Sequence, residues 1–290
     1  MLQQRGHTSA APTLVTLHAH PDDEAIYTGG LLLRAATLGW RCVVIVATSG
    51  EGGRSPRAAV DIGAHRRAET YAAAKILGVA RVEFLGYRDS GMAGDVLPPG
   101  ALAVAEPAEV VARAQAVLDD EDPDLVVSYD LGGVYGHPDH LAVHRLGRGL
   151  SFAGALYEAT INRVELAVLR ERWLGRGMPE AAWPAGLADT LGMDHPGLVR
   201  MEVDRHFARK QSAITAHGSQ VVEADSFMGL PPGVFSPAPG HRVVLPGPVW
   251  RSRGGWPLRG WSGGAGPDGR CSNLAQSKLA SSVSVAVLAD

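Results

Sequence analysis

Apolar and polar residues alternate in blocks along the first 150 residues of the chain. Runs rich in β-branched residues predict four buried strands, at 13–19, 41–48, 81–85 and 124–129. Each run precedes a stretch whose apolar residues recur at helical spacing, and these helices are expected at 25–39, 58–77, 106–121 and 138–146. Four strand-then-helix units are typical of an α/β protein with a Rossmann-like, doubly wound and mostly parallel sheet.

The second half of the chain has a weaker pattern. Helices are expected at 162–175 and 204–217, and a strand at 198–203. From Gly229 to Gly269, 19 of 41 residues are Gly or Pro, and no period is sustained. We therefore expect three parts, which are an N-terminal extension (1–11), one folded domain (12–228) and a poorly ordered C-terminal tail (229–290).

Composition excludes several classes of protein. The chain has 290 residues, 27 Lys and Arg against 30 Asp and Glu, so no positive field favours nucleic acid. Two cysteines rule out a disulfide scaffold and a four-cysteine zinc site. No apolar run approaches the roughly 18 residues of a membrane span, and no secretory leader is evident, so a cytoplasmic protein is expected. The oligomeric state stays open.

Polar clusters follow each predicted strand. The clusters are HPDDE, SGEGGR, GYRDSGM and DLGGVYGHPDH, in chain order. Parallel sheets of this kind bind ligands at the carboxyl ends of their strands. The sequence therefore predicts that these four loops form one site.

Two of the clusters contain histidine and carboxylate residues at metal-ligand spacing. His20 and Asp23 are three residues apart at a helix start, and His137 and His140 repeat that spacing. Each cluster alone also fits a turn that caps a helix, because Asp accepts N–H bonds there. Two such clusters on facing loops favour a His-Asp-His metal site, with Asp22 unbound and available as a general base.

The motifs AHPDDE (19–24) and HPDH (137–140) resemble those of the LmbE-like/PIG-L family of zinc-dependent de-N-acetylases. The resemblance covers about residues 12–230. It includes SGEGG (49–53), HRRAE (65–69), LGYRDSGM (85–92) and AHGSQ (216–220), and it is strongest to the family members of the mycothiol pathway.

The resemblance implies a role for each matching residue of the two motifs. His20, Asp23 and His140 correspond to the family's metal ligands, and Asp22 to its general base. The expected metal is Zn²⁺, although Fe²⁺ would accept the same ligands.

The resemblance also implies residues that contact the substrate. His137 matches a histidine that stabilises the oxyanion or protonates the leaving amine, and Tyr135 a tyrosine that polarises the carbonyl. Arg66 and Asp89 match positions near the sugar. Arg66 could instead form a surface ion pair with Glu69.

Four other residues have open or structural interpretations. His18 is expected to pack at a strand end, and His144 to lie too deep for the site. Asp139 could orient a ligand histidine or cap its helix, and His217 could reach the pocket rim or cap a helix.

The function implied by the resemblance is hydrolysis of an acetamide on a small N-acetylglucosamine-containing molecule. Alternatives are an amidase of mycothiol S-conjugates and a catalytically degenerate sugar-binding member. A nucleotide-binding Rossmann protein is disfavoured, because HPDDE stands where GxGxxG would follow the first strand.

Overall fold

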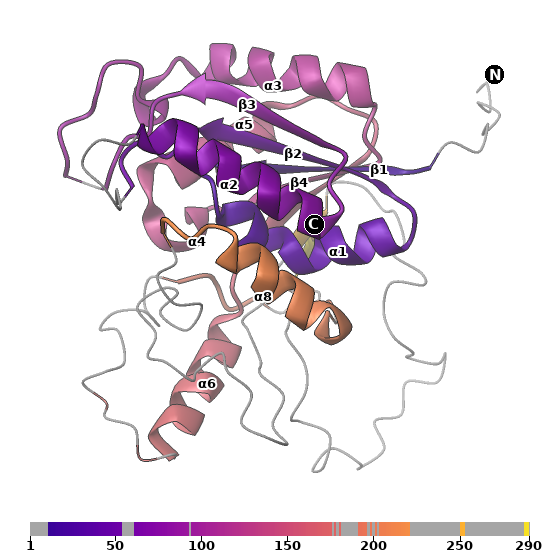
Figure 1. Ribbon diagram of the computed structural model, residues 1–290, viewed down its shortest axis with the longest axis vertical. Helices are drawn as coiled ribbons and strands as arrows, with labels where there is room; N and C mark the ends of the chain where they lie inside the picture. The colour runs from indigo at the N-terminus through magenta and orange to yellow at the C-terminus, as the bar shows by residue number, and fades with distance from the viewer. Residues whose placement is uncertain are drawn as a thin grey trace.

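A five-stranded parallel sheet forms the centre of the computed structural model (Figure 1). Its strands are β1 (Thr13–His18), β2 (Arg41–Thr48), β3 (Arg81–Tyr87), β4 (Leu125–Tyr129) and β5 (Ala155–Ala159). Their order is β3-β2-β1-β4-β5, and every pairing is parallel. The structure describes residues 11–53, 61–92, 94–175, 177, 180, 191–195, 198, 201, 203–220, 250–252 and 287–289.

Helices cover both faces of this sheet, which confirms the doubly wound α/β fold (Figure 1). The α-helices are α1 (Gly29–Thr37), α2 (Ile62–Leu77), α3 (Pro107–Glu121), α4 (Gly133–Gly136), α5 (Pro138–Gly149), α6 (Arg163–Gly175) and α8 (Phe207–Thr215). Helices α1 and α2 lie on one face and α3 and α5 on the other, while α8 packs on α1 and α2. Short segments complete the set, a π-helix η1 (Glu24–Thr28) and 3₁₀ turns η2 (Leu102–Val104) and η4 (Asp204–His206).

Local sequence explains where these helices begin and end. Asp61 caps α2, since its carboxylate accepts the N–H of Ala64 at 3.0 Å. Gly78 ends the same helix with a left-handed φ of 80°, a conformation that costs glycine little. Pro107 and Pro138 start α3 and α5 at the position where a missing N–H is harmless.

Some of the expected elements differ from those observed. The helix expected at 25–39 is a π-helical turn followed by α1, so it begins as an irregular segment. Strand β5 was not expected, because its sequence ALYEA is short and contains a buried glutamate. The strand expected at 198–203 is wrong for the residues described there, which belong to no strand.

The order of the strands creates a topological switch point at the carboxyl edge of the sheet. From β1 the chain winds outward to β2 and β3, then returns to β4 beside β1 and continues to β5. The connections therefore diverge above β1 and β4, which is where doubly wound proteins bind ligands. Strand β1 is buried along its whole length, so the loop that follows it starts from the core.

The predictions about the two termini fall mostly outside the described residues. Of the C-terminal 62 residues, the structure describes only β6 (Trp250–Ser252) and β7 (Val287–Ala289). These two strands pair in parallel as a second sheet and lie against β5. Among the helices described, none is long and apolar enough to cross a membrane.

Candidate metal centre

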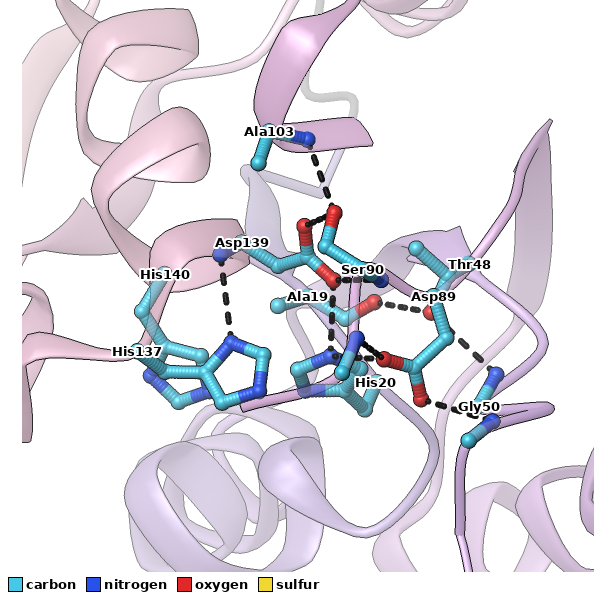
Figure 2. Close-up of polar contacts among 12 residues, drawn as sticks. Ala19, His20, Thr48, Gly50, Asp89, Ser90, Ala103, His137, Asp139 and His140 are labelled. Atoms are coloured by element: carbon cyan, nitrogen blue, oxygen red, sulfur yellow. Dashed lines mark hydrogen bonds and ion pairs between the residues drawn. The ribbon is translucent and has the colours of Figure 1, made fainter. Parts of the chain in front are cut away.

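Polar side chains from three loops meet at the carboxyl ends of β1, β3 and β4 (Figure 2). His20 follows β1, Asp89 follows β3, and His137, Asp139 and His140 stand at the start of α5. All five are buried. The structure thus brings together loops separated by more than 110 residues, as expected from the strand order.

His20, Asp23 and His140 form a compact group whose three ligand atoms lie within 4.8 Å of one another. One Asp23 carboxylate oxygen, Oδ2, is 3.5 Å from His20 Nδ1 and 3.4 Å from His140 Nε2. The spacing leaves room for a cation between a carboxylate and two imidazoles, the donor set that zinc prefers.

The hydrogen bonds of the two histidines fit a metal in this group. His140 Nδ1 lies 3.1 Å from the carbonyl oxygen of Gly133, so Nδ1 carries the proton and Nε2 keeps its lone pair. That Nε2 is buried and has no hydrogen-bond partner in the described part of the chain. His20 similarly directs Nε2 to the Asp139 carboxylate at 3.1 Å, which leaves Nδ1 for a cation.

The pKa values of Asp23 and His20 also indicate that this group would accept a cation. Burial alone would raise the pKa of Asp23, but His140 and His20 hold it well below its usual value. Burial likewise opposes protonation of His20, yet Asp139, Asp23 and Asp89 raise the pKa of His20 well above its ordinary value. A buried site that favours an anion and an added positive charge is suited to a divalent cation.

A second set, His20, Asp89 and His137, also satisfies the distance criterion for metal ligands. It shares His20 with the first. The nitrogen nearest to Asp89 is His20 Nε2, at 3.6 Å, and that atom already donates to Asp139. The geometry therefore favours the first set, in which each histidine offers a nitrogen without a competing bond to Asp139.

Asp139 connects His20 to the loop after β3 (Figure 2). Its Oδ2 accepts bonds from His20 Nε2 at 3.1 Å and Ser90 N at 2.9 Å, and its Oδ1 accepts the Ser90 hydroxyl at 2.5 Å. Ser90 Oγ in turn accepts the N–H of Ala103 at 2.9 Å. Of the two interpretations left open for Asp139, the contacts favour the first, since its carboxylate orients His20, a member of the candidate metal group.

Asp22 stands beside the group in an unusual conformation. Its φ is 93°, a left-handed value that non-glycine residues rarely adopt and that costs about 1–3 kcal/mol. Burial raises the pKa of its carboxyl to about 7, although Arg66 acts in the opposite direction. A carboxyl that titrates near neutral pH is suited to proton transfer.

Arg66 is buried behind this loop, so the expected alternative of a surface ion pair with Glu69 is wrong. Its Nη2 donates to the Pro21 carbonyl at 2.7 Å and to Asp22 Oδ2 at 3.3 Å, and its Nη1 to the Gly50 carbonyl at 2.7 Å. The guanidinium therefore joins the loops after β1 and β2.

Asp89 also joins two loops, the one after β2 and the one after β3. It accepts the N–H of Gly52 at 3.2 Å and of Gly91 at 2.9 Å. Burial would raise the pKa of Asp89, but His20 and the Gly91 N–H lower it, so the side chain is a carboxylate.

His137 and Tyr135 lie next to His140, with Tyr135 4.7 Å from the His140 ring between centroids. The N–H of Asp139 donates to His137 Nδ1 at 3.1 Å, which places the proton of the neutral ring on Nε2. Burial, with His20 and His140, lowers the pKa of His137 to about 4. His137 is therefore a neutral hydrogen-bond donor at pH 7.

Two further histidines, His18 and His144, are held by contacts with Tyr129. His18 contacts the Tyr129 hydroxyl at 3.1 Å and the Thr28 hydroxyl at 3.0 Å, and burial lowers its pKa to about 4. His144 Nδ1 lies 3.0 Å from the Tyr129 carbonyl oxygen. Both are structural, as expected.

Two residues of the site were not singled out in the sequence. Ser90 belongs to the DSGM loop and Glu24 ends the HPDDE motif, but a serine or glutamate in such a motif carries no signal of its partner. Their contacts depend on which loops the fold brings together.

A parallel doubly wound sheet with a His-Asp-His group at the carboxyl ends of its strands defines a class, the α/β proteins with a candidate metal centre at the strand ends. A family model described as PIG-L, GlcNAc-PI de-N-acetylase, matches residues 15–151. The 1D-myo-inositol 2-acetamido-2-deoxy-alpha-D-glucopyranoside deacetylase 1 of Saccharopolyspora erythraea is 33% identical over 243 residues, which cover 73% of this chain and 79% of that protein. The corresponding deacetylase of Nocardia farcinica is 32% identical and covers 91% and 95%. The chain belongs to the PIG-L family of de-N-acetylases.

Solved structures with the same fold are more distant in sequence. The 4-carboxy-2-hydroxymuconate hydratase GalB of Pseudomonas putida KT2440 aligns with a TM-score of 0.53 at 18% identity, over 85% of this chain and 99% of that one. The A40926 pseudoaglycone deacetylase Dbv21 aligns with a TM-score of 0.50 at 19% identity, over 82% and 95%. One is named a hydratase and the other a deacetylase, so the fold alone does not decide the reaction.

Proposed function

We propose that this chain is a zinc-dependent hydrolase that removes the acetyl group from N-acetylglucosamine joined to inositol. The observation that carries the proposal is the buried His20, Asp23 and His140 group, with Asp22 next to Asp23 in the chain and in neither candidate ligand set. The curated relatives at about one-third identity are named as deacetylases of that inositol glucosaminide, which supports the choice of substrate.

His20, Asp23 and His140 would hold the metal ion. When bound, such an ion lowers the pKa of a water molecule from about 15.7 toward about 7 and polarises the substrate carbonyl. Iron(II) would accept the same two imidazoles and carboxylate.

Asp22 would act as the general base. Its carboxyl, with a pKa raised to about 7 by burial, accepts a proton from the attacking water. The same proton then passes to the departing amine, which as an anion would be a poor leaving group. Arg66, whose Nη2 donates to Asp22 Oδ2 at 3.3 Å, would fix the direction of this carboxylate.

His137 and Tyr135 would stabilise the charge that develops on the carbonyl oxygen. His137 offers an Nε2–H because its Nδ1 accepts the N–H of Asp139. Burial raises the pKa of Tyr135, so its hydroxyl keeps its proton and can donate a hydrogen bond. Neither donor loses its proton at neutral pH.

Asp89 and Arg66 would form the sugar side of the site. The carboxylate of Asp89, beside His20, can accept a bond from a sugar hydroxyl in addition to its two backbone N–H bonds. Arg66 would shape this region through the loops it joins, at Pro21 and Gly50.

A substrate panel tests the proposal. The zinc-loaded protein is assayed for acetate and free amine from N-acetylglucosaminyl-inositol, free N-acetylglucosamine and a mycothiol S-conjugate. We expect the inositol glucosaminide to be hydrolysed with the highest kcat/KM. Preferred cleavage of the S-conjugate would reassign the enzyme as an amidase, and no turnover of any of the three by fully metallated protein would refute the proposal.

A further inference from the structure

Glu24, the last residue of the HPDDE motif, forms a buried pair with a residue 193 positions later. Its Oε1 lies 2.6 Å from Nε2 of His217, and both side chains are fully buried. Burial alone would lower the pKa of His217, but Glu24, Asp22 and Glu69 raise it. A fully desolvated pair of this kind is weak evidence for a gain in stability, because desolvation opposes the Coulombic attraction. A gain in stability is therefore not sufficient to explain why this pair is buried here.

The other oxygen of the same carboxylate holds Asp22. Glu24 Oε2 accepts the backbone N–H of Asp22 at 3.1 Å. The strained φ of 93° at Asp22 persists only if the surroundings over-determine it. The Asp22 carbonyl accepts the N–H groups of Ala25 and Ile26, at 3.0 and 3.1 Å, so the Asp22 backbone is held on both sides.

The place of His217 in the fold explains how the pair is kept rigid. His217 follows α8, and its N–H donates to the Ile214 carbonyl at 3.1 Å. Helix α8 packs on α1, α2 and η1, so its end is fixed relative to the HPDDE loop (Figure 1). The Nδ1 atom of His217 is buried and has no hydrogen-bond partner among the described residues. Glu24 is therefore the side chain that orients the His217 ring.

We propose that Glu24 and His217 are positioning residues for Asp22, and that they hold its strained backbone so that its carboxylate faces the substrate. This inference rests on the proposed function, in which Asp22 is the general base. It assigns a catalytic purpose to α8, which lies outside the residues matched by the family model.

Positioning predicts a loss of kcat with little change in KM or metal content. Displacing a reacting group by about 1 Å can cost about 100-fold in rate. We expect Glu24→Ala and His217→Ala each to lower kcat by about 10- to 100-fold. Glu24→Gln should stay within about threefold of the wild type, because an amide can keep both hydrogen bonds if His217 moves its proton to Nδ1.

A control separates this effect from a general loss of packing. His206 is a buried histidine that precedes α8 at the end opposite to His217. His206→Gln should leave kcat unchanged even if it lowers the midpoint of thermal unfolding. Zinc per chain is measured for every variant, so that a lost metal is not mistaken for a displaced base.

A double-mutant cycle provides the decisive readout. If His217 acts through Asp22, His217→Ala should have little further effect on the residual rate of Asp22→Asn, because the group that it positions is already removed. An equal fold-loss in both backgrounds, or an unchanged kcat in metallated His217→Ala and Glu24→Ala, would overturn the inference. Wild-type protein without deacetylase activity would instead refute the proposed function, so the two failures are distinguishable.

Discussion

Replacing Asp139 with alanine should weaken metal binding although Asp139 is not itself a proposed ligand. Its carboxylate is the acceptor that fixes His20 Nε2 at 3.1 Å, and with it the direction of Nδ1. Loss of such an outer carboxylate typically lowers metal affinity by about 10- to 100-fold. That range corresponds to about 1.4–2.7 kcal/mol of binding free energy.

The same substitution should destabilise the metal-free protein. It removes the acceptor of three buried donors, which are His20 Nε2, Ser90 N and Ser90 Oγ. Each buried donor left without a partner costs about 1–3 kcal/mol, part of which relaxation or entering water recovers. We expect the free energy of unfolding to fall by about 3–5 kcal/mol. Asp139→Asn should cost much less, because an amide has nearly the same shape and can still accept from His20 and donate to Ser90.

The assay combines zinc competition against a chromophoric chelator with denaturant unfolding in the presence of a chelator. Asp120→Ala is the matched control, since its side chain is 69% exposed and only pairs with Arg81 on the surface. An Asp139→Ala variant that bound zinc with wild-type affinity would refute the idea that Asp139 orients His20. Weakened binding in Asp139→Asn equal to that in Asp139→Ala would show that charge, not orientation, is decisive.

Three further predictions follow from other groups of the site. Asp22→Asn should keep its zinc but lose about 100- to 10,000-fold in turnover, as measured by metal analysis and acetate release, and equal loss of metal would contradict its role as a base. Arg66→Gln should move the acidic limb of the pH profile of kcat/KM to higher pH, because Arg66 lowers the pKa of Asp22, and an unmoved limb would contradict that contact. The buried His18, whose pKa is about 4 in the fold against an ordinary 6.5, stabilises the metal-free protein above pH 6.5 and loses that contribution as the pH falls toward 4. The difference in free energy of unfolding between the wild type and His18→Gln should therefore shrink by about 3 kcal/mol between pH 6.5 and pH 4. A difference that stays the same at every pH would count against this role of His18.

The sheet could be predicted because its buried strands have a strong local signal. Strands β1 and β2 are continuous runs of apolar and β-branched residues, as parallel strands covered on both faces require. β5 lacked this signal, since its buried Glu158 interrupts the run. The irregular start of the first helix also escaped notice, because a π-helical turn leaves no period of its own in five residues.

That His20, Asp23 and His140 lie together could be predicted for a different reason, which is chemical. Two pairs at three-residue spacing, His20 with Asp23 and His137 with His140, indicated a metal site. The strand order then placed both motifs at one edge of the sheet. The contacts of Arg66, Ser90 and Glu24 could not be predicted in this way. Each depends on loops that are distant in sequence, and the direction of a buried side chain is set by packing rather than by local pattern.

The most direct test of the central claim is the position of the metal in crystals of the zinc-loaded protein, located by anomalous scattering at the zinc edge. We predict one strong peak about 2.0–2.2 Å from His20 Nδ1, His140 Nε2 and an Asp23 oxygen. The Asp22 carboxylate should lie nearby without binding the ion. A peak between His20 Nε2, Asp89 and His137 instead, or no ordered zinc at the first site, would contradict the account.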